Sequence, residues 1–105
     1  MKLNSSDEIL TFEKQTIVCL HTPGHTPGSI SIIVDKDGKR LLFAQDIHGP
    51  LLKEFGSNLT EYDRSTQKLL DLNADILCEG HFGIYPTKKQ VKEYIRSCRR
   101  RYGLD

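Results

Sequence analysis

The alternation of hydrophobic and polar positions predicts short strands in the first half of the chain. Residues 8–20, EILTFEKQTIVCL, hold two β-prone apolar runs, which indicates two strands. In SISIIVD, Ile30, Ile32 and Val34 alternate with their neighbours and predict a strand with one well-buried face. The Asp-Gly pair of DKDGK and the returning run RLLFAQD complete a β-hairpin over Gly28–Asp46.

Helical patterns dominate the second half. SNLTEYDRSTQKLLDL, residues 57–72, predicts a helix with Ser57 or Asn58 as its N-cap. ADILCEG predicts a short buried strand. PTKKQVKEYIRSCRRRYGL predicts a second helix with Pro86 in its first turn. The predicted order is β-β-β-β-α-β-α, an α+β fold with a mostly antiparallel sheet, and residues 1–105 are expected to form one domain.

Composition and charge narrow the function classes. The chain has 37% hydrophobic residues and a formal net charge of +1, which gives no general attraction to nucleic acid or anionic membranes. Its three cysteines are widely spaced, and MKLNSSDEIL shows no signal peptide. No apolar run approaches the ~20 residues that cross a bilayer. We therefore expect a cytoplasmic protein with reduced thiols and neither a nucleic-acid nor a membrane partner.

Potential metal ligands follow each strong predicted strand. His21 and His25 lie in HTPGHTPGS after the second run, Asp46 and His48 follow the returning hairpin strand, and His81 follows the short strand DILCE. A single histidine is most often an ordinary surface or core residue. Three such groups at strand ends, however, favour a site for divalent zinc, iron or manganese. A catalytic zinc takes about three protein ligands and leaves one position for water.

These segments together resemble the C-terminal half of the metallo-β-lactamase superfamily. TPGHTPGS is followed by LLFAQD and, after a helix, by DILCEGHFG, in the order typical of that family. The resemblance implies His25 as a metal ligand, Asp46 as the carboxylate bridging two metals, and His81 as a ligand of the second metal. His21 precedes the loop and is not a ligand in that pattern. Gln45 and Phe82 stand where the family often has glycine, and neither removes a ligand.

The family's His-x-His-x-Asp-His motif is absent, since no histidine precedes His21. The resemblance therefore implies half of an αββα sandwich. The expected function is the C-terminal part of a zinc-type hydrolase that is catalytically incomplete alone, with weak metal binding. Whether the chain is an enzyme by itself stays open. One alternative is a non-catalytic module that binds a partner or itself and keeps vestigial ligands, and another is a metal site completed across a dimer.

Four further residues are possible pocket-lining positions: His21, His48, Glu79 and Tyr85. The missing half would leave one face of the sheet exposed, carrying some of Ile17, Cys19, Ile30, Ile32, Val34, Leu42 and Ala44. Exposed apolar faces of this size are usually covered by a partner. The expected partner is a second copy of the chain or the missing N-terminal half of the fold.

Overall fold

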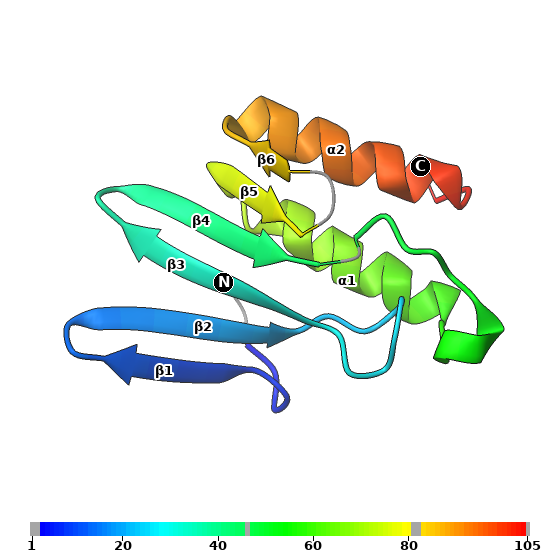
Figure 1. The fold of residues 1–105 in the computed structure, drawn as a ribbon, viewed down its shortest axis with the longest axis horizontal. Helices are drawn as coiled ribbons and strands as arrows, with labels where there is room; N and C mark the ends of the chain where they lie inside the picture. Colours follow the sequence, from blue (N-terminus) through cyan, green and yellow to red (C-terminus); the bar gives the residue numbers. More distant parts are fainter. Residues whose placement is uncertain (1–2, 46, 81–82, 105) are drawn as a thin grey trace.

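The computed structural model describes residues 3–45, 47–80 and 83–104. Six strands form one sheet in chain order, and every neighbouring pair is antiparallel except β4 and β5, which are parallel (Figure 1). The strands are β1 (Glu8–Phe12), β2 (Gln15–His21), β3 (Ile30–Lys36), β4 (Lys39–Ala44), β5 (Ile76–Glu79) and β6 (Gly83–Tyr85).

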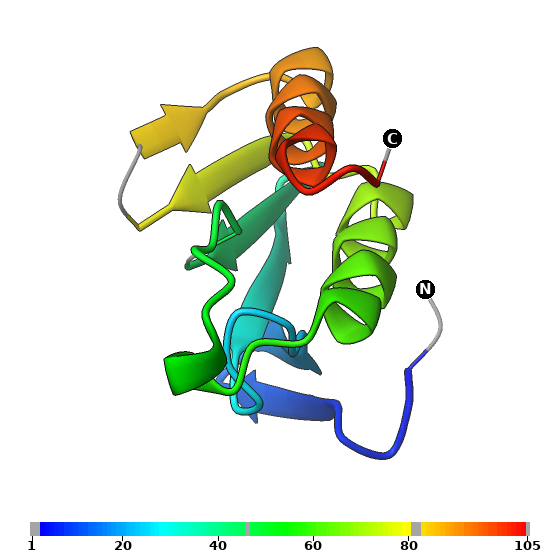
Figure 2. The ribbon, with the colours of Figure 1, turned by 90° about the vertical axis from the view of Figure 1, so that its right-hand side faces the viewer.

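The helices α1 (Leu59–Asp71) and α2 (Lys88–Arg101) pack on the same face of the sheet, as Figure 2 shows. A parallel strand pair needs a crossover, and α1 provides the one between β4 and β5. The short 3-10 helix η1 (Lys53–Phe55) precedes α1. Asn58 caps α1 by accepting a hydrogen bond from the backbone N–H of Glu61 at 2.9 Å. The result is a two-layer unit, one sheet and one layer of helices, with one sheet face that the helices leave uncovered.

The α+β class and the predicted strand and helix order are confirmed. The tight hairpin between β3 and β4 turns at Asp37 and Gly38, whose φ angles are both positive at 54° and 75°. Two details differ from the prediction. The three-residue strand β6 was not expected, and α2 begins after Thr87, whose side chain accepts from the backbone N–H of Gln90. Pro86 therefore precedes the cap, where its missing N–H also costs nothing.

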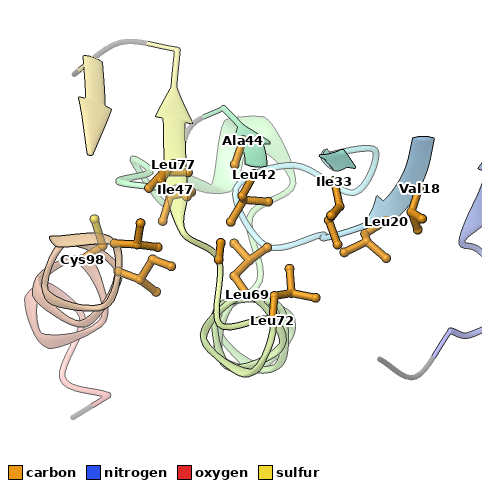
Figure 3. Packing of buried hydrophobic residues seen from close by; sticks show 13 residues of the cluster. Val18, Leu20, Ile33, Leu42, Ala44, Ile47, Leu69, Leu72, Leu77 and Cys98 are labelled. Atoms are coloured by element: carbon orange, nitrogen blue, oxygen red, sulfur yellow. The ribbon is translucent and has the colours of Figure 1, made fainter. Parts of the chain in front are cut away.

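The core lies between the sheet and the two helices (Figure 3). From the sheet, Leu20, Leu42 and Leu77 are 0% exposed, and Ile33 is 1% exposed. From the helices, Leu69 of α1 and Val91, Ile95 and Cys98 of α2 face them. Each fully buried large aliphatic side chain stabilises the fold by about 1.5–3 kcal/mol.

The expected face holds for the first hairpin strand and differs for the second. Ile30, Ile32 and Val34 lie on the uncovered face as expected, with Ile30 54% exposed, whereas Ser31 and Ile33 face the helices. Leu42 and Ala44, which were also candidates for the uncovered face, are buried in the core. The physical reason is that LLFA is apolar at every position, so a shift of one residue exchanges the two faces without changing the pattern.

The face away from the helices, called the open face below, is apolar across all six strands. Strand register places the following side chains on it: Leu10, Ile17, Cys19, Ile30, Ile32, Val34, Leu41, Phe43, Ile76, Cys78 and Ile84. Several are well exposed, among them Phe43 at 40% and Ile84 at 67%. A shallow hollow of about 420 Å³ runs over Ile32 and Phe43 toward the ends of β4 and β5. The open face is a surface suited to a second layer.

Candidate functional site

The loop HTPGHTPGS connects β2 to β3 and is tied to α1. Gly24 has a φ of 148°, and a Cβ built there would lie 2.5 Å from the Tyr62 Cα. The backbone N–H of Asn58 donates to the Gly24 carbonyl at 2.8 Å, and Ser65 Oγ donates to the Pro23 carbonyl at 2.6 Å. The close approach of loop and helix therefore requires glycine at position 24, and it holds the next residue, His25, in place.

His25 is oriented by contacts on both its ring and its backbone. Its Nδ1 lies 2.6 Å from the Pro50 carbonyl oxygen, and its own carbonyl accepts from Ser57 Oγ at 2.6 Å. The ring also meets Phe55 edge-on, with centroids 5.4 Å apart. Since a carbonyl only accepts, Nδ1 carries the proton and the neutral ring has its lone pair on Nε2. Metal-binding histidines are commonly oriented in this way, by an N–H donated to a backbone carbonyl.

His21 closes β2 and contacts its own loop. Its Nε2 lies 2.7 Å from the Pro27 carbonyl oxygen, and its backbone N–H donates to Asp7 Oδ1 at 2.7 Å. Asp7 Oδ2 also accepts from Lys68 Nζ at 2.8 Å. The contact of the His21 ring with the Pro27 carbonyl therefore braces the loop that carries His25.

Two of the three predicted ligands, Asp46 and His81, lie outside the described residues. Their segments nevertheless leave the same end of the sheet, because β4 and β5 are parallel neighbours and Ala44 pairs with Glu79. The backbone N–H of Gly80 donates to the Ala44 carbonyl at 3.2 Å. Residues 35 apart in the chain are thus brought to adjacent strand ends, where α/β folds commonly place functional groups.

The predicted pocket residues His48 and Glu79 are brought together. His48 Nδ1 lies 3.2 Å from Glu79 Oε2, and the Tyr94 hydroxyl donates to the same oxygen at 2.5 Å. Burial, reinforced by the hydrogen bond to Glu79, raises the pKa of Tyr94, so its hydroxyl stays a donor at neutral pH. Tyr85 stacks on Tyr94 with centroids 4.3 Å apart. The sequence pattern does not indicate this polar contact of Tyr94.

The loop after β4 is anchored to both helices. The Tyr102 hydroxyl donates to the His48 carbonyl at 2.9 Å, and the Tyr62 hydroxyl donates to the Ile47 carbonyl. The two tyrosine rings meet edge-on, with centroids 5.3 Å apart. Burial raises the pKa of Tyr62, which keeps this donor protonated. The same loop presents the Pro50 carbonyl to His25, so its position determines the orientation of that ring.

Within residues 3–45, 47–80 and 83–104, no three His, Cys, Asp or Glu side chains cluster as a metal site. His25 has the tautomer and the hydrogen-bonded support that a metal ligand needs. Imidazole and carboxylate together are a donor set that suits zinc, iron or manganese. In that same part of the chain, no helix is long and apolar enough to cross a membrane.

Comparisons with known proteins point to one fold. No family model matches the chain. The hydroxyacylglutathione hydrolase GloC of Haemophilus influenzae is 34% identical over 98 residues, covering 85% of this chain and 43% of that protein. A B3 metallo-β-lactamase with an active-site glutamic acid superposes with a TM-score of 0.73 at 21% identity, over 99% of this chain and 45% of that one. The class B3 di-zinc metallo-β-lactamase LRA-12 from an Alaskan soil metagenome gives a TM-score of 0.69 at 21% identity, over 90% and 46%.

The sheet, its helix layer and the loops at its strand ends therefore match part of the fold of these solved structures. That fold is the metallo-β-lactamase fold, and the resemblance of this chain to the metallo-β-lactamase superfamily is confirmed. The chain spans less than half the length of the curated relative that it matches.

Proposed function

We propose that this chain is the C-terminal part of a metal-dependent hydrolase of the metallo-β-lactamase superfamily, supplying His25, Asp46 and His81 as metal ligands. The observation that carries the proposal is the 2.6 Å contact between His25 Nδ1 and the Pro50 carbonyl, which leaves the lone pair of the neutral ring on Nε2. The relationship to a hydroxyacylglutathione hydrolase supports a hydrolytic reaction.

The metal in this proposal is zinc, with iron or manganese as alternatives of the same donor preference. Bound in such a site, it lowers the pKa of a water ligand to about 7 and so supplies a nucleophile. The chain's own residues hold the ligands: the loop of His25 is braced by α1, and the segments of Asp46 and His81 extend from adjacent strands. In this arrangement His25 serves one metal, His81 serves the other, and Asp46 bridges the two. Two ligands per metal are fewer than tight zinc binding needs, so the 105 residues are catalytically incomplete alone.

We further propose that the open face packs against the remaining part of the fold in the complete protein. The relatives are more than twice as long as the matched region, and the open face is apolar from β1 to β6. Two sheets pack face to face at about 10 Å when both inner faces are apolar. The ligands still needed would then come from the second layer. A cytoplasmic location, without a nucleic-acid or membrane partner, remains part of this proposal.

A zinc titration of the 105-residue chain tests the ligand assignment. Wild type should bind weakly, with a dissociation constant above ~1 μM, because too few ligands are present. His25→Ala should weaken this binding further, whereas the control Glu93→Ala, at an exposed position of α2, should not. Equal affinity for His25→Ala and wild type would contradict the assignment. Sub-micromolar binding that is lost in His25→Ala would support His25 as a ligand, but it would refute the claim that the isolated chain has an incomplete metal site. Hydrolysis of a glutathione thioester, measured alongside, should be absent.

The open face also favours a second candidate, a non-catalytic module that binds a partner through its sheet. In that case zinc binding should be absent from wild type and both variants. A third candidate is a metal site completed across a dimer. It predicts that zinc binding rises with protein concentration, together with dimer formation.

A further inference from the structure

Glu79 is a buried carboxylate at the end of β5. The residue is 4% exposed, and its side chain is fully covered from solvent. It lies on the helix side of the sheet, as Leu77 does two positions earlier, so it points away from the open face. A charge in such a place is stable only where hydrogen-bond donors compensate for the water it has lost.

The donors to Glu79 come from two other elements. His48 belongs to the loop after β4, and Tyr94 belongs to α2, and both reach Oε2, at 3.2 Å and 2.5 Å. Hydrogen bonds to a carboxylate are about twice as strong as those between neutral groups. Glu79 therefore joins β5, the loop after β4 and α2 at one point.

This point lies beside both ligand-bearing segments. His48 is two residues after Asp46, and Glu79 is two residues before His81. Next to it, a Cβ on Gly80 would lie 3.0 Å from Gln45 Cγ, so the two strand ends are already in tight contact.

The same loop reaches the third predicted ligand. Its backbone is held by Tyr102 at the His48 carbonyl, and two residues later the Pro50 carbonyl orients His25. A contact that fixes His48 thus acts on the segments of all three ligands.

We propose that Glu79 is a positioning residue for the metal site, holding the loop after β4 and the end of β5 together through His48. This inference rests on the proposed function and extends it to two residues outside the predicted ligand set. Glu79 also fixes the His48 ring with its proton on Nδ1, because a carboxylate only accepts. Tyr94 keeps the carboxylate in place from the side of α2.

The test compares Glu79→Leu, which removes both acceptor oxygens, with Glu79→Gln, which keeps one. The control is Glu93→Gln, the same amide change at an exposed position of α2. At constant pH, nitrogen NMR of the imidazole rings gives the tautomers, and hydrogen exchange follows the amides of Ile47, His48 and Gly49. Zinc affinity is titrated, and denaturation gives the global stability.

We expect Glu79→Leu to populate the Nε2-protonated form of His48, to speed local amide exchange roughly tenfold or more, and to weaken zinc binding roughly 10–100-fold. Glu79→Gln should show smaller changes, and Glu93→Gln should show none. A residue with only a structural role would change global stability but leave the His48 and His25 tautomers and the zinc affinity as in wild type. That result would overturn the proposal.

If wild type binds no zinc at all, the metal part of the proposed function fails. The His48 tautomer and the local exchange rates then still decide whether Glu79 positions the loop. A shift of both in Glu79→Leu supports the positioning role, and wild-type values in a folded variant refute it.

Discussion

The open face predicts that the isolated 105-residue chain self-associates, and Phe43 gives the sharpest test. Phe43 lies near the middle of this face, with Ile32 and Cys78 beside it in register, and it is 40% exposed. A phenylalanine side chain has roughly 200 Å² of surface, so about 80 Å² remains to be buried. At about 25 cal/mol per Å², covering this area contributes ~2 kcal/mol.

A symmetric dimer doubles the effect, because the same residue appears in both copies of the interface. Phe43→Lys should therefore weaken the dimer by ~4 kcal/mol, or about 1000-fold in its dissociation constant. Light scattering and sedimentation at tens of micromolar measure the change. Gln67→Lys introduces the same charge at an exposed position of α1 and serves as the control. A wild-type chain that is monomeric at these concentrations, or equal behaviour of the two variants, would refute the reasoning.

Two further predictions concern the loop and the N-terminal segment. Gly24→Ala should destabilise the fold by ~2–5 kcal/mol in urea unfolding, because its Cβ would meet the Tyr62 backbone at 2.5 Å, whereas Gly28→Ala, with no atom within 4 Å, should be nearly neutral. Burial tends to raise the pKa of Asp7, but its hydrogen bonds from Lys68 and from the backbone N–H groups of Asn4 and His21 outweigh it and lower the pKa below the usual 3.8. Asp7→Asn should therefore lose stability above about pH 5, and its difference from wild type should shrink as the pH falls below 3.8. A difference independent of pH would show that the charge of Asp7 does not contribute.

The elements of this fold are predictable because their signals are local. Asp37-Gly38 specifies the hairpin turn through positive φ angles, and Asn58 specifies the start of α1. The face of β4 was not predictable in the same way, because the run LLFA is apolar on both sides of the sheet. Period-two alternation reports burial only when one face is polar. Strand β6 is three residues long, too short for a periodic signal.

The sequence likewise predicted some parts of the candidate site and missed others. HTPGHTPGS identified a loop and separated His25, as the expected ligand, from His21. Each of the two rings contacts a backbone carbonyl, His25 through Nδ1 and His21 through Nε2, and the ligand role stays a prediction. Sequence spacing does not show that His48 meets Glu79 across 31 residues, since that contact depends on the parallel pairing of β4 and β5. The hydrogen bonds of the Tyr94 and Tyr102 hydroxyls were also missed, because the sequence of an apolar helix stripe does not show whether a tyrosine in it is hydrogen-bonded.

Strand β1 is the outermost strand of the sheet and every residue in it is exposed. Among the residues that the structure describes, it adds no side chain to the core and pairs only with β2, so its outer row of N–H and C=O groups forms an edge without a partner strand there. Ile9, Leu10 and Phe12 lie along that edge and are each at least 50% exposed. An apolar edge of this kind is a template for strand addition and, at high concentration, for fibrillar aggregation. A lysine or proline placed in β1 is therefore the simplest way to keep the isolated chain in solution, at little cost to the fold.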